Sequence, residues 1–503
     1  MEKTLKLFFT SDVHGYFSPI DYATGLPADT GLANCMSAFI DDGNTLIIDG
    51  GDTLQGSPFT YFLQKSGLAA DNIPAKVMNI AGYHFYTLGN HDFNYGAENL
   101  QRHINGVNAQ CLCANVEGLE GVKKSALVTM KNGLKVGITG ITTDFINIWE
   151  KSENLVGINI TDPFPTAEKA LAELKEAGAD ITICIYHGGF ECDIATGRRL
   201  SETRENQAYK ICKELSFDVL LTGHQHIAMS GKRLYNTFIC QTSDKAKNYI
   251  AGEISVSDGE VNAELKLVEA GKQSCPEALT LLEPYEKKAA LWMDSPVGHL
   301  DHELLPGDHL DMAANGSLIA NFFNQVQLEA SGAQISITSL ANDVKGFNKN
   351  VTIRDIVATY IYPNTLITLE MTAETIKKVL ERSAEYFSLD GDRLEISESF
   401  LKPKVEHYNY QYLSGIEVVM DIRRPMGERV VSIKYNGEEL AKDKKYTVCM
   451  NNYLASGTGG YDFIKSCKRI KEEPTEIAEL IMDYISSHNN ISVDTAKYLT
   501  LIV

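Results

Sequence analysis

The feature that constrains the fold most is a series of short apolar runs separated by helical patterns. The runs lie at 5–10, 45–49, 85–88, 181–186 and 217–222. Short apolar runs bounded by turn residues are typical of buried strands, and strands that alternate with helices indicate an α/β layered fold. One intervening helix is well delimited, because Asp162 can cap it, Pro163 suits its first turn and Gly178 can end it. We therefore predict an α/β fold for the first half of the chain.

Each of these runs ends next to polar side chains of the kinds that bind metal ions. These side chains are Asp12, His14, Asp52, Asn90, His187, His224 and His226. Ligands of open α/β folds bind beyond the carboxyl ends of the strands, so we expect these residues to meet at one site. Two carboxylates, four imidazoles and one amide oxygen complete two four-ligand shells if one carboxylate bridges two ions. Nitrogen and oxygen ligands favour Mn²⁺, Zn²⁺ or Fe.

Each residue also has an ordinary structural explanation. A histidine after a strand is commonly a hydrogen-bonded loop residue, and an aspartate there commonly caps a helix. An asparagine beside a glycine commonly forms a turn. The joint occurrence of all of them at five strand ends favours a dimetal site.

The length of 503 residues predicts two domains. The pattern becomes β-rich after Tyr235, and an amphipathic run reads as a linker helix over 276–294. We expect a first domain at 1–275 and a second at 295–503, with helices near 315–330 and 373–387 and a strand at 335–338. The second domain therefore reads as α+β.

Charge and hydropathy exclude several classes of protein. A net charge of −20 without a clustered basic surface disfavours long nucleic acids, although a small anionic substrate is compatible if metals supply positive charge. No segment approaches the roughly 20 apolar residues that span a bilayer, so we expect no membrane segment. The N-terminus lacks a signal-peptide pattern, which predicts a cytoplasmic protein, or an extracytoplasmic one if the sequence has been trimmed. The ten cysteines include no C-x-x-C pair and suit buried free thiols.

Five motifs give the chain a resemblance to a known family. They are D-x-H at 12–14, G-D-x-x-Q-G-S at 51–57, G-N-H-D at 89–92, His-Gly-Gly at 187–189 and G-H-x-H at 223–226. The chain resembles the dimetal metallophosphoesterases and, more closely, the two-domain 5′-nucleotidase group. Within that group it looks like the bacterial 2′,3′-cyclic-nucleotide 2′-phosphodiesterase/3′-nucleotidase branch, through 51–58, 90–96, 362–366 and 451–457. The resemblance implies a calcineurin-like, four-layer α/β-β/α metallophosphatase sandwich followed by an α+β nucleoside-binding domain of the 5′-nucleotidase type.

The resemblance also implies roles for individual residues. One metal would be held by Asp12, His14, Asp52 and His226, and the other by Asp52, Asn90, His187 and His224. Paired cations would generate a hydroxide for in-line attack on phosphorus. His91 would stabilise the transition state or protonate the leaving oxygen. Asn94 stands where the 5′-nucleotidases have an aspartate that orients this histidine, and we interpret it as a marker of the cyclic-nucleotide branch.

In the second domain the resemblance implies a base sandwiched between Tyr410 and Tyr461. Ordinary packing is the alternative for both rings. The 5′-nucleotidases carry a Gly-Gly-Gly-Ile-Arg segment, whereas 338–347 of this chain lacks the arginine. Asn342 and Lys345 are the candidates for substrate contacts there.

The predicted function is hydrolysis of 2′,3′-cyclic nucleotides to 3′-nucleotides, and of these to nucleoside and phosphate. The alternatives are a 5′-nucleotidase and a catalytically silent nucleotide-binding protein that has lost its metals. Motifs of serine hydrolases and P-loop enzymes are absent from the sequence. We expect a monomer or a weak dimer.

Overall fold

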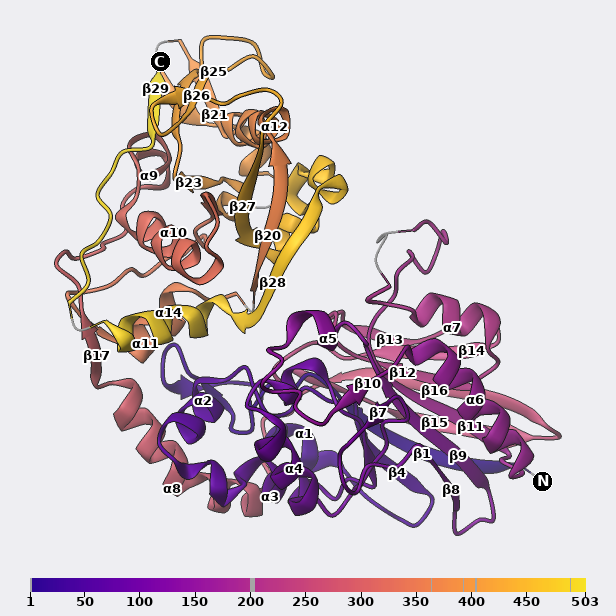
Figure 1. The fold of residues 1–503 in the computed structure, drawn as a ribbon. Coiled ribbons are helices and arrows are strands. Elements are labelled where there is room, and N and C mark those ends of the chain that lie inside the picture. Colours follow the sequence, from indigo (N-terminus) through magenta and orange to yellow (C-terminus); the bar gives the residue numbers. More distant parts are fainter. Residues whose placement is uncertain (1, 200–203, 363, 392, 403–404, 489) are drawn as a thin grey trace. The chain divides into compact units, whose positions relative to one another are not determined.

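The computed structural model describes residues 2–199, 204–362, 364–391, 393–402, 405–488 and 490–503. The chain forms two compact units (Figure 1). The first unit comprises Met1–Asp21 and Gly25–Ala290, and the second comprises Tyr22–Thr24 and Leu291–Val503. Helix α8 (Pro276–Met293) occupies the range expected for the linker helix, and most of its residues belong to the first unit.

The first unit contains two six-stranded sheets with the orders β16-β15-β1-β4-β5-β6 and β13-β14-β12-β11-β9-β8. The strands of the first sheet are β1 (Lys3–Thr10), β4 (Thr45–Asp49), β5 (Phe85–Tyr86), β6 (Gln110–Cys111), β15 (Asn248–Ser257) and β16 (Glu260–Glu269). Those of the second are β8 (Ser125–Thr129), β9 (Lys135–Thr142), β11 (Ile181–His187), β12 (Val219–Thr222), β13 (Met229–Leu234) and β14 (Thr237–Gln241). Strands β1, β4, β5 and β6 are parallel, as are β9, β11, β12 and β14.

The two sheets pack face to face because alternate strand residues are apolar. Leu7 and Phe9 of β1 lie in one buried cluster with Ile183 and Ile185 of β11. Such alternation is typical of strands with two distinct faces. The opposite face of β11 presents Cys184 and Tyr186 to the helices.

Helices cover both outer faces and complete a sandwich of four layers. Helix α6 (Pro163–Glu176) lies beside β9 and β11 (Figure 1), and its Ala167 and Leu171 join the same cluster as Tyr186. Helix α4 (Ala97–Gly106) packs on the other sheet through His103, whose ring lies 6.0 Å from that of Tyr86. The remaining helices are α1 (Leu32–Cys35), α2 (Pro58–Lys65), α3 (Ile73–Ala81), α5 (Ile146–Trp149) and α7 (Ala208–Glu214). The predicted α/β-β/α sandwich is confirmed.

The second unit is built on a five-stranded sheet with the order β23-β18-β27-β20-β28 and a four-stranded sheet with the order β26-β25-β24-β29. The strands are β17 (Pro296–His299), β18 (Ile335–Thr338), β19 (Asn350–Thr352), β20 (Thr365–Thr372), β21 (Phe387–Asp390), β22 (Arg393–Ile396), β23 (Tyr412–Ser414), β24 (Glu417–Asp421), β25 (Val430–Tyr435), β26 (Glu438–Glu439), β27 (Lys445–Asn451), β28 (Lys468–Glu476) and β29 (Leu499–Ile502). The helices are α9 (His309–Asn315), α10 (Leu318–Ser331), α11 (Ile353–Thr359), α12 (Ala373–Ala384), α13 (Asn452–Ala455) and α14 (Ile477–Ser487). This mixture is the predicted α+β class.

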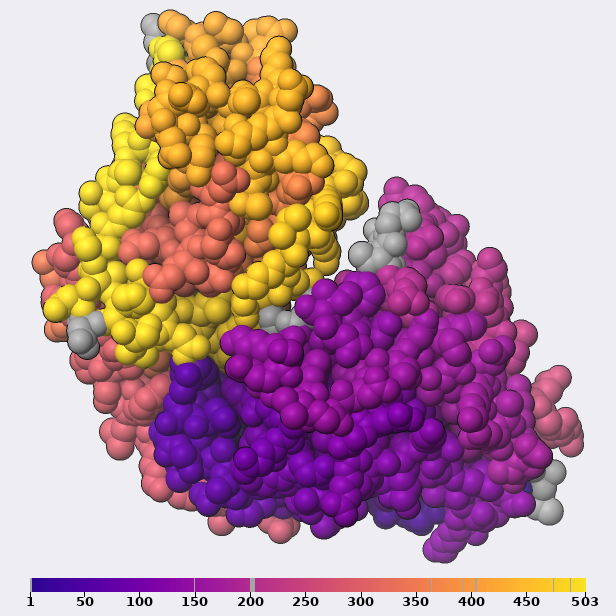
Figure 2. Space-filling view, in the orientation of Figure 1, coloured from indigo at the N-terminus to yellow at the C-terminus, as the bar shows by residue number. Residues whose placement is uncertain are grey.

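The C-terminal segment between α14 and β29 lies on the outside of the second unit, where Figure 2 shows it in yellow. Asn321 of α10 holds it by donating to the carbonyl oxygens of Asp494 and Ala496, at 3.0 and 2.9 Å.

All ten cysteines are free, and seven of them are buried, in agreement with the expected thiols. Among the described residues, no helix combines the length and apolarity that crossing a bilayer requires.

Candidate metal centre

Strand register brings the predicted site residues together at one edge of the first unit. In the first sheet Thr10 pairs with Asp49, and Asp49 pairs with Tyr86. In the second sheet Tyr186 pairs with Thr222. Because these strands are parallel within each sheet, their carboxyl ends lie at the same edge of the sheet. The loops that follow the strands therefore come close together.

One group that could hold a metal ion consists of Asp12, His14 and His226. The Nε2 atoms of the two histidines lie 3.1 Å apart. Nε2 of His226 lies 3.4 Å, and Nε2 of His14 4.0 Å, from Oδ1 of Asp12. The donor atoms of the three side chains therefore lie close enough together to bind one metal ion.

A second group consists of Asp52, His187 and His224. Asn90 belongs with it, because its Oδ1 lies 3.2 Å from Nε2 of His187 and 2.8 Å from Nδ1 of His224. The four side chains lie at the ends of four different strands, β4, β5, β11 and β12, as the sequence predicted. Histidine, carboxylate and amide donors suit a first-row transition metal.

Asp52 lies between the two groups. Its Oδ2 atom is 3.1 Å from Nε2 of His187 and 3.9 Å from Nε2 of His14. The residue is 1% exposed, and Oδ2 has no hydrogen-bond partner, although an unpaired buried carboxylate oxygen is costly. A pair of cations bridged by Asp52 would satisfy this atom. The donor set therefore fits two divalent metal ions.

Hydrogen bonds from the opposite ring nitrogens orient three of the histidines. Nδ1 of His14 lies 2.9 Å from the carbonyl oxygen of Gln55, and Nδ1 of His187 lies 2.7 Å from that of Gly50. Nε2 of His224 lies 3.0 Å from Oε1 of Glu205. Each acceptor requires an N–H on the nitrogen facing it, which leaves the other nitrogen free to ligate.

Backbone conformation at the site is strained. Asp12, His14, Asp52, His224 and His226 all have positive φ, between 50° and 70°. Left-handed backbone is unfavourable for residues other than glycine and concentrates at functional sites.

Glycines permit the close approach of the loops. A Cβ atom on Gly89 would lie 2.2 Å from Oδ1 of Asp52, and one on Gly223 would lie 2.6 Å from Oδ2 of Asp12. Any side chain at either position would displace a candidate ligand.

Opposing effects set the protonation of the buried groups. Burial lowers the pKa of His14 to about 4, which keeps its ring neutral. Burial opposes charge on Asp52 too, but the neighbouring His187 and His91 hold the pKa of Asp52 well below its usual range. Burial opposes charge on His187, but the Asp52 carboxylate raises the pKa of His187 to about 10, so a metal ion must displace the proton on Nε2 in order to bind.

Asp92 supports the loop that carries Asp52. One carboxylate oxygen of Asp92 accepts from the backbone N–H groups of Asp52 and Gly89, at 2.9 and 2.8 Å. The other accepts from Thr53 and Leu54, at 2.8 and 3.0 Å. Four donors on one buried carboxylate fix the loop between two strand ends.

His91 and Asn94 are in direct contact. Nδ1 of His91 lies 2.8 Å from Oδ1 of Asn94. The backbone N–H of His91 donates to Oδ1 of Asp52 at 2.7 Å, so the backbone of His91 is held against a candidate ligand. Its ring also lies edge-on to that of His14, with centroids 5.1 Å apart.

The two tyrosines expected to stack on a base, Tyr410 and Tyr461, are buried in the second unit. Tyr410 is 3% exposed and Tyr461 is fully buried. The hydroxyl of Tyr410 donates to the carbonyl oxygen of Ala313, and that of Tyr461 donates to the carbonyl oxygen of Asn409, both at 2.9 Å. Both rings thus lie within the protein interior, and a base sandwiched between them stays a prediction.

Asn342 and Lys345 are engaged in local contacts. The Asn342 amide donates to the carbonyl oxygen of Val405 and accepts from the N–H of His407, at 2.8 and 3.0 Å. The ammonium of Lys345 pairs with Asp343 at 2.7 Å on the surface. These contacts give Asn342 a loop-bridging role.

A different group of tyrosines lines a pocket of about 310 Å³ in the second unit. The lining residues are Ser339, Tyr362, Asn364, Tyr408, Asn451 and Tyr453. The ring of Tyr408 lies 6.3 Å from those of Tyr362 and Tyr453. Partly apolar walls with a few amides are typical of small-molecule sites.

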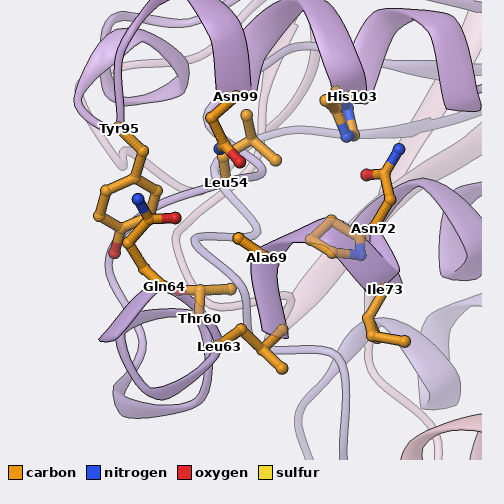
Figure 3. A pocket seen from close by; sticks show the side chains of 11 residues that line it. Leu54, Thr60, Leu63, Gln64, Ala69, Asn72, Ile73, Tyr95, Asn99 and His103 are labelled. Carbon is orange, nitrogen blue, oxygen red and sulfur yellow. The ribbon is translucent and has the colours of Figure 1, made fainter. Parts of the chain in front are cut away.

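A smaller cavity, of about 20 Å³, lies in the first unit among Leu54, Asn72, Tyr95, Asn99 and His103 (Figure 3). Its volume suits a single water molecule. The Nδ1 atom of His103 is buried without a hydrogen-bond partner. We assign this cavity no part in the metal centre.

Sequence reasoning assigned no role to Asp92, Glu205 or Glu150. Asp92 stands inside a motif that was recognised, so its position next to His91 was the available signal. Glu205 and Glu150 follow no strand and come from distant loops. Nothing in the local sequence around these two glutamates indicates which side chains they contact.

Comparison with known proteins agrees with this geometry. Residues 5–228 match the calcineurin-like phosphoesterase family, and residues 296–466 match the 5′-nucleotidase C-terminal domain. A 2′,3′-cyclic-nucleotide 2′-phosphodiesterase/3′-nucleotidase of Haemophilus influenzae is 25% identical, and the alignment covers 96% of this chain and 84% of that protein. A 5′-nucleotidase of Vibrio cholerae is 22% identical, with coverage of 98% and 92%.

Among solved structures, a putative 5′-nucleotidase from Staphylococcus aureus matches with a TM-score of 0.73 and 29% identity, over 100% of both chains. The NAD nucleotidase of Haemophilus influenzae has the same fold, with a TM-score of 0.66 and 18% identity, over 100% of this chain and 99% of that chain. Both family matches and the paired histidine–carboxylate groups lead to one conclusion. The chain belongs to the two-domain metallophosphoesterases of the 5′-nucleotidase family, hydrolases of phosphoric esters that use two divalent metal ions.

Proposed function

We propose that this protein hydrolyses 2′,3′-cyclic nucleotides and 3′-nucleotides. The observation that carries a hydrolytic function is the buried Oδ2 atom of Asp52, which has no hydrogen-bond partner and lies between two histidine groups. The choice of substrate is supported by the names of relatives that align over nearly the whole chain, and by Asn94 as the partner of His91. A 5′-nucleotidase is the second candidate, because relatives with that name also align over most of the chain.

The proposed metal ligands are those that the resemblance implied. Asp12, His14, Asp52 and His226 would hold one ion, and Asp52, Asn90, His187 and His224 the other. The ions would supply positive charge for the phosphoryl oxygens and activate water. The complete donor set argues against a catalytically silent nucleotide-binding protein.

His91 is the proposed catalytic residue that handles a proton. Because Asn94 presents its oxygen, Nδ1 of His91 donates to it, and the proton for the leaving oxygen is a second one, carried on Nε2 of the doubly protonated ring. Protonation of a poor leaving group such as a ribose oxygen contributes typically 10² to 10⁴ in rate. Asn94 holds the ring for this step.

The second unit supplies the proposed nucleoside site. We place the base in the pocket of Tyr362, Tyr408 and Tyr453 instead of between Tyr410 and Tyr461. Aromatic faces bind any base, at roughly 1 to 3 kcal/mol for each stacked base. In this proposal the chain divides into a phosphoesterase domain at 1–275, a linker helix at 276–294 and a nucleoside-binding domain at 295–503.

A substrate panel tests the proposal. Phosphate release is measured from 2′,3′-cyclic AMP, 3′-AMP and 5′-AMP with Mn²⁺, Zn²⁺ or Co²⁺ present. For the cyclic substrate a phosphomonoesterase is added to the assay. It releases phosphate from the ring-opened product, so ring opening is detected even when this protein hydrolyses the product no further. We expect turnover of the first two substrates, and activity on 5′-AMP alone would overturn the substrate assignment.

A further inference from the structure

Behind the His91–Asn94 pair lies a third side chain, the carboxylate of Glu150. The amide nitrogen of Asn94 donates to Oε2 of Glu150 at 2.6 Å. Glu150 is 9% exposed, as is His91. Glu150 immediately follows the short helix α5, whose Ile146 accepts its backbone N–H. The contact therefore joins two loops that are separated by 56 positions in the chain.

We propose that Glu150 is a positioning residue that sets the tautomer of His91 through Asn94. An ionised carboxylate only accepts hydrogen bonds, so the group of Asn94 that faces Glu150 must be its NH₂. The amide oxygen of Asn94 then faces His91, and Nδ1 of His91 must carry the proton. One acidic side chain thus fixes both the orientation of an amide and the nitrogen that faces substrate.

The second carboxylate oxygen of Glu150, Oε1, is fixed by two hydrogen bonds. It accepts from the N–H of Lys151 at 2.7 Å and from the amide of Asn154 at 2.8 Å. Asn154 also donates to the backbone carbonyl oxygen of Asn94 at 3.0 Å. Both donors to Oε1 are fixed, so only an acceptor fits at this position.

This arrangement predicts the effect of glutamine at 150. The glutamine oxygen would take the place of Oε1, because Lys151 and Asn154 both donate to it. Its NH₂ would then face Asn94, whose amide must turn its oxygen toward glutamine and its NH₂ toward His91. Nδ1 of His91 would become an acceptor, and the proton would move to Nε2.

The kinetic test of this inference rests on the proposed function, because it measures the turnover of 3′-AMP. The spectroscopic test does not depend on that function. We expect Glu150→Gln to lower kcat for 3′-AMP by about 10- to 100-fold, the range typical of residues that orient a ligand or catalytic group. In the metal-free protein, ¹⁵N shifts of the His91 ring should change from the Nδ1–H to the Nε2–H tautomer. Glu153→Gln, at an exposed glutamate of the same segment, is the matched control and should leave both unchanged.

A double variant separates positioning from folding. Asn94→Asp alone would set two carboxylates against each other at the 2.6 Å contact and should be impaired. In Asn94→Asp/Glu150→Gln the glutamine NH₂ can donate to the new aspartate, which can still accept from Nδ1 of His91. We expect this double variant to regain kcat to within about tenfold of the wild type, above both single variants.

Wild-type kcat in Glu150→Gln, an unchanged tautomer, or a double variant no better than the single variants would overturn the inference. A wild-type protein that releases no phosphate from any nucleotide would instead overturn the proposed function. In that case the tautomer measurement decides the role of Glu150 by itself.

Discussion

The carboxylate of Asp92 accepts the backbone N–H of Asp52 at 2.9 Å. The same carboxylate also accepts three further backbone N–H groups from the two loops that carry Asp52 and Asn90. The proposed bridging ligand is thus held by a residue that is not itself a ligand.

Asp92→Asn should weaken metal binding. The amide oxygen of the new asparagine would accept from only two of the four N–H groups. Its NH₂ group would face the other two N–H groups, which are donors as well. We expect the affinity for Mn²⁺ to fall by about 10- to 100-fold, as measured by competition with a chelator. Asp258→Asn, in an exposed turn with positive φ that asparagine tolerates, is the control. Equal affinity in the two variants would contradict the role of Asp92.

Glu205→Ala should affect one metal more than the other. Glu205 contacts His224, which belongs to the second ligand group. We expect the affinity for one of two ions to fall by about tenfold or more in a stepwise titration, while the other stays within a few-fold. Equal loss at both sites would show that Glu205 acts on the fold of the loop and not on His224.

Tyr408→Ala and Tyr453→Ala should each raise KM with little effect on kcat. Losing one stacking face costs roughly 1 to 3 kcal/mol, which corresponds to about a tenfold or larger rise in KM for 3′-AMP. Tyr410→Phe removes only a buried hydrogen bond and should lower the free energy of unfolding by about 1 kcal/mol. A raised KM in Tyr410→Phe, with normal KM in the other two variants, would restore the sandwich expected from sequence.

His103→Phe should reduce the sensitivity of the protein to acid. Burial lowers the pKa of His103 to about 4. The unfolded chain, with an ordinary histidine pKa near 6.5, therefore binds a proton that the folded protein excludes between these values. Folding stability falls as pH decreases through this window, by about 1 to 3 kcal/mol for this group.

Urea unfolding at pH 7.5 and at pH 4.5 provides the measurement. The wild type should lose more free energy of unfolding between the two pH values than His103→Phe does. Phenylalanine keeps the ring contact with Tyr86 and removes the titrating group. Identical losses in the two proteins would show that His103 does not contribute to acid sensitivity.

The metal centre was predictable because it depends on a simple geometric rule. Parallel strands end level, so residues such as Asp12, Asp52 and His187 converge although they are distant in the sequence. The layers of the first unit were predictable for a related reason, since apolar alternation specifies which strand faces pack. Neither inference requires knowledge of individual side-chain contacts.

The position of the proposed nucleoside site depends on such contacts and stays a prediction. Tyr410 and Tyr461 occupy the positions that the family pattern indicates, but their burial is set by side chains from several elements, including Tyr386 at 4.9 Å from Tyr410. Glu150 contacts Asn94, and Glu205 contacts His224, from other segments of the chain. Their partners are decided by tertiary packing, which a local sequence pattern does not encode.

The count of metal ions bound by the folded protein tests the central claim most directly. After saturation with Mn²⁺ and removal of excess metal, elemental analysis should give two ions per chain for the wild type. The same analysis should give fewer than two for Asp52→Ala, which lacks the proposed bridging carboxylate. Fewer than two ions in the wild type would contradict the dimetal centre.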